Sequence, residues 1–338
     1  MDALALSLLA CPACGGRLDG ALRCRACGTA YRRTDGITDL RLPGDARTER
    51  VREFYAAAPF PGYPARDSIE WLRTRAERSP FARLLDAAIP YDARILEMGC
   101  GTGQMSLYLA RGERIVIAAD LCRPSLALGR AAATRLGIGQ VEFVETDVHH
   151  PGLREGAFDI VYCSGMLHHT PNPYAAFVRV ARLVRPGGLI VIGLYNRYAR
   201  LPHRLRRVAA FLTGGRWVRA DRVLASRRAQ PERYRAWLND QYHHPEEHSH
   251  TLAQLRRWFA ANDIAYIRAV PGALLDQTDG AGLTDAEEDG WWLEDILAQI
   301  GWIGRIGWEG GLFATVGRAK RSACMTGEDD RIASPEHA

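Results

Sequence analysis

The sequence has 338 residues, 47% of them hydrophobic, which suffices for two domains or for one decorated domain with a sizeable core. No run reaches the roughly 18 uninterrupted apolar residues of a transmembrane helix, and the N-terminus lacks the basic segment of a signal peptide, so we expect a cytoplasmic protein without a transmembrane segment. The net charge of +5 gives little support for a nucleic-acid partner, because the 44 basic residues include a single lysine, a usage typical of GC-rich genes.

Four of the eight cysteines are clustered near the N-terminus. They form two C-x-x-C pairs, Cys11 with Cys14 and Cys24 with Cys27, separated by nine residues. Thiolates at this spacing form a closed tetrahedral site for one structural zinc ion, and a unit with so little core needs such a metal. We therefore predict a zinc ribbon over residues 1–42, with two redox-active pairs as the alternative.

The sequence around these cysteines, LLACPACGGRLDGALRCRACGTAYRRTDGITDL at 8–40, resembles the zinc-ribbon family of methyltransferase activator subunits. The likeness lies in the LACPxC start, the C-x-x-C-G-x-x-Y segment and the late D-G-I. Thr38 replaces the family's usual proline and Arg32 follows Tyr31, but neither departure touches the metal ligands. Stand-alone members of that family activate methyltransferases that act on tRNA, rRNA and release factors. The resemblance implies a ribbon fused in cis, which stabilises a catalytic domain or shapes its substrate entrance.

Segment 43–92 contains helical stretches on both sides of the loop PFPGYP at 59–64, with a break at Ser79-Pro80. We expect this segment to be a helical linker that forms a lid over a cofactor. Phe60 and Tyr63 are the candidate lid residues, and packing of the ribbon onto the next domain is their alternative role.

Short apolar strands alternate with helices from residue 93 onward. Strands are expected at 93–99, 114–120, 141–147, 158–165, 189–195, 264–270 and 310–318. This alternation implies crossover connections and a parallel sheet covered on both faces. The predicted fold is α/β, with a doubly wound, seven-stranded, mostly parallel sheet over 93–320. Insertions are expected at 196–250 and 271–311, and a disordered tail at 321–338.

The stretch ILEMGCGTG places Glu97, Gly99, Gly101 and Gly103 at every second position between a strand and a helix. Glycines permit positive φ and let the backbone approach a ligand closely. A nicotinamide-binding turn would read G-x-G-x-x-G, but Gln104 stands in place of its third glycine. A carboxylate in the turn would also repel a pyrophosphate, so the turn suits a cationic ligand or an amino group.

This stretch resembles motif I of class I S-adenosylmethionine-dependent methyltransferases, and later motifs agree with it. Asp120 ends the second strand, where the family's acid binds ribose hydroxyls, and Asp147 ends the third, where the family's acid meets the adenine amino group. CSGMLHHTPNP at 163–173 resembles the fourth-strand motif, and LVRPGGLIVIG at 183–193 resembles the loop and fifth strand.

The resemblance implies a Rossmann-like methyltransferase fold over about 90–195 and 250–318, with S-adenosylmethionine as its cofactor. Acids at the carboxyl ends of strands line the crevice where ligands bind in open α/β sheets, and carboxylates accept hydrogen bonds from hydroxyl and amino groups. The predicted cofactor-binding residues are Glu97, Gly99, Gly101, Gly103, Asp120, Leu121, Asp147, Val148, Ser164 and Gly165.

The fourth strand is not followed by N/D-P-P-Y/F, the signature of amino-methyltransferases. The residues at 166–170, MLHHT, resemble small-molecule methyltransferases of ubiquinone and menaquinone biosynthesis instead, while Asn172-Pro173-Tyr174 comes too late and starts the next helix. We therefore expect an enzyme that methylates an O, N or C nucleophile of a small-molecule acceptor. RNA or protein methylation is the alternative that the ribbon suggests, and a catalytically silent, cofactor-binding module that recruits a partner is the third.

Catalytic residues are harder to predict, because methyl transfer needs little beyond proximity and in-line geometry, and a general base depends on the pKa of the acceptor. His168 is a candidate base, with loop hydrogen bonding as its alternative role. Tyr195 and Asn196 follow the fifth strand and are expected to face the acceptor. His243 belongs to DQYHHPEEHSHT at 240–251, whose four histidines suit a metal site, an acid–base cluster or a polar lid.

The two insertions carry opposite charge. Residues 197–235 contain 12 arginines against two acids, whereas residues 271–295 contain eight acids and no basic residue. We expect the two insertions to pair with each other. Binding of phosphates or RNA and binding of an anionic lipid surface are the other candidate roles of the arginine-rich insertion.

Overall fold

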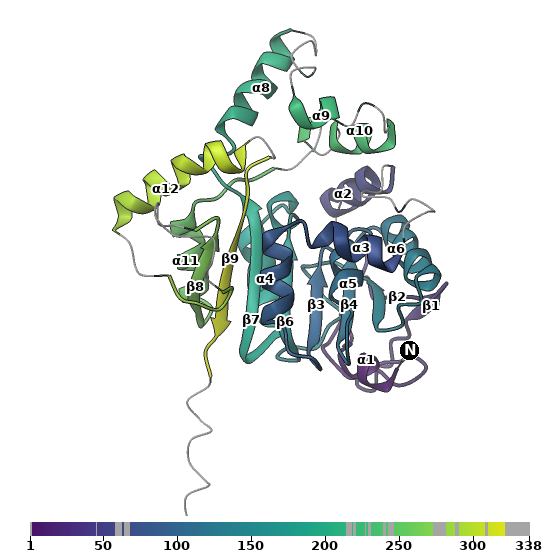
Figure 1. The fold of residues 1–338 in the computed structure, drawn as a ribbon. Helices are drawn as coiled ribbons and strands as arrows, with labels where there is room; N and C mark the ends of the chain where they lie inside the picture. The colour runs from purple at the N-terminus through teal and green to yellow at the C-terminus, as the bar shows by residue number, and fades with distance from the viewer. Residues whose placement is uncertain are drawn as a thin grey trace, which may run out of the picture.

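The computed structural model describes residues 2–44, 46–57, 63, 68–213, 218, 221–226, 228, 231–238, 241–242, 247–272, 282–287, 291–307 and 310–321. Its centre is a nine-stranded sheet of order β1-β2-β5-β4-β3-β6-β7-β9-β8 (Figure 1). The strands are β1 (Arg32–Thr34), β2 (Ile37–Asp39), β3 (Arg94–Met98), β4 (Ile115–Asp120), β5 (Val141–Glu145), β6 (Phe158–Ser164), β7 (Val184–Tyr195), β8 (Ile264–Val270) and β9 (Leu312–Ala319).

Strands β3 to β9 match the seven strands predicted from the sequence, and their arrangement confirms the α/β fold. From β2 to β7 every neighbouring pair in the sheet is parallel. Only β9, between β7 and β8, and β1, at the opposite edge, run antiparallel to their neighbours. The strand order reverses between β3 and β6, which is the point where open α/β sheets bind ligands.

Helices cover both faces of the sheet (Figure 1). They are α1 (Ala3–Ser7), α2 (Ala46–Ala57), α3 (Ile69–Ala76), α4 (Pro80–Ala88), α5 (Gln104–Leu109), α6 (Arg123–Arg135), η1 (Leu167–His169), α7 (Pro173–Ala181), α8 (Leu201–Leu212), α9 (Arg222–Ser226), α10 (Pro231–Leu238), α11 (Leu252–Ala260) and α12 (Trp292–Arg305). Successive strand residues point to opposite faces. Ile95 therefore packs with α3 to α6 in one core, and Leu96 packs with α1, α7 and α11 in the other.

Local sequence sets several helix starts. Asn172 caps α7 by accepting from the backbone of Ala175, with Pro173 in the first turn, as expected for a segment that starts a helix. Thr251 and Gln254 form a capping box at the start of α11. α7 ends at Ala181, and β7 begins at Val184, five residues before the strand expected at 189–195.

The ribbon is part of the main sheet, which the sequence did not predict. β2 pairs with β5 from Ile37 opposite Phe143 to Asp39 opposite Glu145, and residues of α1 lie in the core beneath the sheet. An ion pair of 2.7 Å between Arg33 and Glu142 ties the hairpin to the same strand. The domain limits of 1–42, 43–92 and 93–320 remain a prediction, but the first segment is built onto the last.

The arginine-rich insertion stands over the carboxyl ends of the strands as α8, α9 and α10 (Figure 1). Arg200 and Arg207 of this insertion pair with Glu247, near its end. In the acidic insertion, Asp295 pairs with Arg256 of α11 at 2.6 Å. Arg200 also donates to the carbonyl of Gly310 in the acidic insertion, at 2.7 Å. Because Asp276, Asp279, Glu288 and Asp289 lie outside the described residues, the expected charge pairing of the two insertions stays a prediction. The predicted tail at 321–338 lies outside the described residues except for Arg321.

Candidate active site

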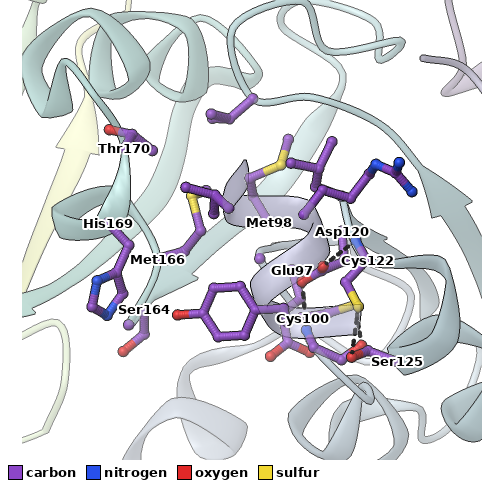
Figure 2. Close-up of a pocket in the computed structure, with 18 of the residues that line it drawn as sticks. Glu97, Met98, Cys100, Asp120, Cys122, Ser125, Ser164, Met166, His169 and Thr170 are labelled. Carbon is purple, nitrogen blue, oxygen red and sulfur yellow. Dashed lines mark hydrogen bonds between the residues drawn. The ribbon is translucent and has the colours of Figure 1, made fainter. Parts of the chain in front are cut away.

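A cavity of about 550 Å³ opens at the carboxyl ends of the central strands (Figure 2). Glu97 reaches it from β3, Asp120 from β4, Asp147 from the loop after β5, Ser164 from β6 and Tyr195 from β7. All the predicted cofactor-binding residues line this cavity except Gly103. The parallel sheet brings together side chains that lie up to about 100 residues apart, because it ends all these strands at one edge.

The glycine turn after β3 needs glycine for its backbone. Gly99, Gly101 and Gly103 have φ values of +76°, +56° and +74°, a region that other residues rarely adopt. A Cβ on Gly99 would lie 2.5 Å from Cβ of Met166. Gly103 starts α5 in the left-handed conformation rather than lining the cavity, so its role is to turn the chain.

Glu97 is a buried carboxylate at the base of this turn. Its Oε2 accepts hydrogen bonds from the backbone N–H of Ser106, at 2.7 Å, and from the Ser106 hydroxyl. Burial raises its pKa to about 7, and the nearby Asp120 adds to this, although the Ser106 hydrogen bonds act in the opposite direction. An ionised carboxylate in such a place is stabilised by a cation that binds beside it.

Asp120 and Asp147 serve as backbone acceptors in the loops that follow their strands. Asp120 accepts from the N–H of Gly101 and of Cys122, both at 2.7 Å, which fixes the glycine turn against the end of β4. Burial raises its pKa despite these bonds. Asp147 accepts from the N–H of His149 at 2.9 Å. Each carboxylate is thus held in one orientation at the cavity wall while keeping lone pairs for a further donor.

The two histidines of η1 lie in different places. His169 lines the cavity (Figure 2), and its ring meets Tyr55 and Tyr195 edge to face, with centroids 6.4 and 5.7 Å apart. His168, the candidate base predicted from the sequence, is fully buried and stacks on the Tyr195 ring with centroids 3.8 Å apart. It is not among the residues that line the cavity, because the tight turn of η1 directs adjacent side chains differently.

Tyr195 lines the cavity as expected, but Asn196 does not. The Asn196 side chain is fully buried and donates to Oε1 of Gln299 at 2.9 Å. Its Oδ1 accepts from the backbone N–H of Tyr198 and Ala199. The expectation that Asn196 faces the acceptor is therefore wrong, since all of its polar atoms hold the turn after β7.

A buried arginine supports the Tyr195 ring from behind. The Arg200 guanidinium, which is fully buried, lies 3.7 Å from the Tyr195 ring centroid and binds both oxygens of Glu247, at 2.7 and 3.2 Å. It also donates to Oε1 of Gln241, whose amide donates to the Tyr195 hydroxyl at 2.8 Å. Burial alone would raise the pKa of Glu247, but the Arg200 hydrogen bonds outweigh it and hold that pKa below its usual range. This network fixes both ends of the tyrosine side chain.

We expect Arg200→Gln to lower the free energy of unfolding by about 3–5 kcal/mol, because it leaves Glu247 buried without its main partner. Arg207 binds the same carboxylate at 3.1 Å but is about a third exposed. Arg207→Gln is therefore the matched control and should cost less than about 1 kcal/mol. Urea denaturation of both variants measures the difference, and equal effects would contradict the assigned role of Arg200.

One wall of the cavity comes from the segment 43–92 that was expected to form a helical lid, but its lining residues were not singled out from the sequence. Thr48, Val51, Arg52 and Tyr55 of α2 line it, together with Phe54. Their spacing could have indicated this, because positions 48, 51, 52 and 55 recur at the three- and four-residue intervals of one helix face. Trp237 and Gln241 of the arginine-rich insertion also line the cavity.

The lid role predicted for Tyr63 is not supported by its contacts. Its hydroxyl donates to the backbone carbonyl of Thr102 at 2.8 Å, and its ring packs against the core beneath the glycine turn. Phe60 lies outside the described residues.

Part of the histidine-rich segment runs alongside the end of β7 and is hydrogen-bonded to it. The N–H of His248 donates to the carbonyl of His168 and that of His250 to the carbonyl of Tyr195, both at 2.8 Å. Burial and the nearby His248 lower the pKa of His250 to about 4. His243 lies outside the described residues, so its predicted catalytic role stays a prediction. In the described part of the chain, the four N-terminal cysteines are the only cluster with the ligands and spacing of a metal site.

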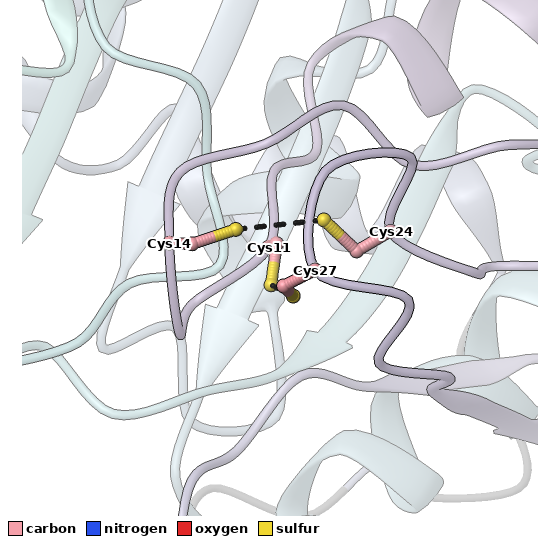
Figure 3. A group of neighbouring side chains, drawn as sticks. All are labelled: Cys11, Cys14, Cys24 and Cys27. Atoms are coloured by element: carbon pink, nitrogen blue, oxygen red, sulfur yellow. Dashed lines mark hydrogen bonds between the residues drawn. The ribbon is translucent and has the colours of Figure 1, made fainter.

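The cysteine cluster has the geometry of a four-thiolate site (Figure 3). The four sulfur atoms of the cluster lie within 4.8 Å of one another. The Cys14 and Cys24 sulfurs are 3.5 Å apart, and the Cys11 and Cys27 sulfurs are 3.7 Å apart. Zinc–sulfur bonds of about 2.3 Å in a tetrahedron would separate the sulfurs by about 3.8 Å. The residues present therefore fit a structural zinc ion, as predicted, and the Tyr31 hydroxyl lies 2.9 Å from the Cys11 sulfur as a further hydrogen-bond partner.

The strand order and the acids at three successive strand ends define a class I methyltransferase fold. Residues 96–192 match the family described as "Methyltransferase domain", and residues 2–36 match the family described as "Trm112p-like protein". The chain therefore carries a class I methyltransferase domain behind a Trm112-like zinc ribbon, and the resemblances drawn from both sets of motifs are confirmed.

Similar proteins agree with this identification. An uncharacterized protein of Synechococcus is 27% identical over 253 residues, covering 66% of this chain and 60% of that protein. The ubiquinone biosynthesis O-methyltransferase of Cronobacter sakazakii is 31% identical over 140 residues, covering 38% of this chain and 57% of that protein. The chain thus spans at most about three fifths of these relatives. Among solved structures, PKMT2 from Rickettsia typhi shares the fold with a TM-score of 0.50 at 14% identity, over 70% of this chain and 52% of its own.

Within the described residues, every helix is too short or too polar to cross a membrane.

Proposed function

We propose that this protein is an S-adenosylmethionine-dependent methyltransferase that methylates an O, N or C nucleophile of a small, largely apolar acceptor. The observation that carries the proposal is one cavity with two unlike sides. Glu97, Asp120 and Asp147 line it after β3, β4 and β5, and His169 and Tyr195 line it from β6 and β7, across the reversal of strand order. The names of the matched relatives, ubiquinone biosynthesis O-methyltransferases from several bacteria, point in the same direction.

The acidic side of the cavity fits S-adenosylmethionine. The buried Glu97 carboxylate is stabilised by a bound cation, and we assign it to the amino group of the methionine part. Gly101 lets the backbone approach the ligand closely, and Gly99 makes room for Met166 at the cavity wall. Asp120 and Asp147 are assigned to the ribose hydroxyls and the adenine amino group. When bound there, the cofactor supplies an electrophilic methyl group on its sulfonium.

The other side of the cavity suits an apolar acceptor. Phe54, Tyr55, Met166, Trp237 and Leu312 contribute to its wall, and such a lining favours burial of rings or alkyl chains over charged groups. Residues of α2 and α10 line the cavity, and in Figure 1 both helices lie above the carboxyl ends of the strands. A cavity of about 550 Å³ has the size of a small-molecule site, which favours a small acceptor over a folded RNA or protein.

His169 is the side chain that we assign to the proton of the acceptor. It lines the cavity between Tyr55 and Tyr195, so an imidazole nitrogen can accept the proton that a hydroxyl or amine loses on methylation. Tyr195 is held by Arg200 and Gln241 and positions the acceptor beside His169. The chain thus supplies orientation and one proton acceptor, which is sufficient for in-line transfer.

The proposed activity can be tested with purified, zinc-replete protein and tritiated S-adenosylmethionine. Cell extract from the source is divided into an organic-solvent fraction, an aqueous small-molecule fraction, RNA and protein, and the label is counted in each. We expect label in the organic fraction. Label confined to RNA or protein would reject an enclosed apolar acceptor, and no label in any fraction, despite measured cofactor binding, would favour a catalytically silent module.

His169→Gln should lower kcat by about 100-fold or more, because it removes a general base, and should leave the Kd for S-adenosylmethionine unchanged. The adjacent His168→Gln serves as the matched control. Since His168 packs on Tyr195 away from the cavity, this change should lower thermal stability and have a smaller effect on kcat. Steady-state kinetics on the identified acceptor and thermal unfolding of both variants measure these effects. A larger kcat loss for His168→Gln would reverse the assignment.

A further inference from the structure

One helix of the arginine-rich insertion exposes an apolar face. Leu201, Leu205, Val208 and Leu212 of α8 recur at four- and three-residue intervals, so they form one stripe along the helix. Phe211 lies beside the stripe and is 86% exposed, and Leu212 is 75% exposed. Large apolar side chains on a regular helix are normally covered, so the exposure of the four stripe residues and of Phe211 indicates a contact with something outside the domain.

The opposite face of α8 is firmly attached to the protein. His203 is buried, and its Nε2 lies 2.8 Å from the carbonyl oxygen of Gln241. Ala210 is also buried, on the side of the helix opposite to the stripe. Arg207 binds Glu247 at 3.1 Å, and Arg204 donates to the hydroxyl of Ser249. The helix is therefore held with its apolar stripe outward, and in Figure 1 it projects beyond the rest of the molecule.

The insertion that carries the stripe is rich in arginine. Twelve arginines lie between residues 197 and 235, against only two acids. Arg200 and Arg207 pair with Glu247 and Arg206 pairs with Asp221, whereas Arg228 and Arg235 are exposed on the segments that follow α8. A second copy of this chain on the stripe would bring two basic insertions together, and like charges repel. An RNA backbone would match the charge but would leave the apolar stripe in water.

We propose that α8 docks the protein on an anionic lipid surface. Its apolar stripe enters the interface, and the arginines beside it bind the lipid headgroup phosphates. A helix with leucine and phenylalanine on one side and arginine on the other has the composition of helices that lie in a membrane interface. Anionic headgroups attract each nearby arginine, so charge complementarity selects this occupant.

The location of α8 relates docking to the cavity. Trp237 and Gln241 line the cavity from the same insertion that carries α8, and the Gln241 carbonyl is in contact with His203 of α8. A protein docked through α8 would therefore hold the aromatic side of its cavity near the lipid. An apolar acceptor dissolved in the membrane would reach the cavity without crossing water. This last step rests on the proposed function, whereas the docking itself does not.

Vesicle sedimentation of the full-length protein tests the docking. The probes are vesicles of phosphatidylcholine alone and of phosphatidylcholine mixed with phosphatidylglycerol. We expect binding to the mixed vesicles only, and weaker binding as salt is raised. Leu205→Ser and Phe211→Ser should each weaken binding about tenfold, and Arg235→Gln about fivefold. Leu128→Ser, on the exposed side of α6, is the matched control and should bind as the wild type does.

Two measurements keep the test independent of folding and of activity. Thermal unfolding and S-adenosylmethionine affinity of each variant should equal those of the wild type, because no substituted residue lines the cavity. Binding that is equal on both kinds of vesicle, or absent from both, would overturn the proposal. It would also be overturned by sedimentation velocity showing a dimer that Phe211→Ser dissociates, or by binding to total RNA without binding to vesicles. Vesicle binding without any methyl transfer would support the docking while rejecting the proposed function.

Discussion

Glu97→Gln is expected to weaken S-adenosylmethionine binding by about 100-fold, as measured by isothermal titration calorimetry at pH 8. The substitution keeps the size of the side chain and its hydrogen bonds to Ser106, but it removes the charge that we assign to the cofactor's amino group. Charge-assisted hydrogen bonds contribute about 1.5–3 kcal/mol each, and the loss is larger where water is excluded.

The same carboxylate predicts how binding depends on pH. Burial raises the pKa of Glu97 to about 7 in the free protein, and only the ionised form attracts an ammonium group. The fraction ionised is about one tenth at pH 6 and about nine tenths at pH 8, so the Kd should rise about tenfold on going from pH 8 to pH 6. In Glu97→Gln this pH dependence should disappear, and its persistence would show that another group titrates.

As the pH rises, the free energy of unfolding of the cofactor-free protein should fall, whereas cofactor binding should strengthen. The folded protein holds a proton on Glu97 up to about pH 7, whereas an unfolded glutamate releases it near pH 4.3. The protein therefore loses stability as the pH rises between these values, by on the order of 3 kcal/mol. Glu97→Gln should consequently raise the melting temperature of the cofactor-free protein at pH 8 by several degrees.

A second buried glutamate at a strand end provides the control. Glu145 ends β5 and pairs with Arg41 and Arg123 at 3.0 and 3.1 Å. It does not line the cavity. Glu145→Gln should therefore leave cofactor affinity and its pH dependence unchanged, although burial raises the pKa of this carboxyl too. If Glu97→Gln lowered the melting temperature at pH 8, burial of the ionised Glu97 carboxylate would not be the cost in stability described above.

Loss of the zinc ligands is expected to destabilise the methyltransferase domain as well as the ribbon. Cys24→Ser, or prolonged treatment with a chelator, should lower the melting temperature of the entire domain by about 20 °C, since a structural zinc contributes on the order of 10 kcal/mol to the unit that it holds. The reason is the shared sheet and core, in which β2 pairs with β5 and Ala5, Leu8 and Leu40 pack with the central strands.

Differential scanning calorimetry distinguishes a shared fold from two separate ones. A single transition at lower temperature is the expected result for Cys24→Ser. Two transitions, with the upper one at the wild-type temperature, would mean that the methyltransferase domain folds without the ribbon. Cys122→Ser, a cysteine far from the cluster in sequence, is the control, and its zinc content should remain that of the wild type.

The positions of the three acids could be predicted because the rule that places them is simple. Parallel strands end at one edge of a sheet, and the apolar runs before Glu97, Asp120 and Asp147 mark where those strands end. The ribbon strands β1 and β2 could not be predicted in the same way. Each has three residues, too few to show a two-residue periodicity, and their formation depends on the partner strand β5.

The catalytic side was less predictable because it depends on the direction of single side chains. His168 and His169 are adjacent, and only the geometry of η1 decides that the second one faces the cavity. Asn196 follows Tyr195 in the same way, yet it turns inward to Gln299, a residue 103 positions away. Contacts of this range are not encoded in a local pattern, so sequence motifs locate the site more reliably than they select its reacting groups.

The pairing of β2 with β5 also bears on how the protein avoids association with itself. Without the ribbon, β5 would be an edge strand with an unpaired backbone, a surface on which other chains can add strands. The ribbon moves the edge to β1, which is short and carries Arg32 and Arg33, features that discourage such pairing. Because both parts belong to one chain, the covering strand is present at a high effective concentration. Protection of this edge is then independent of how much protein a cell makes.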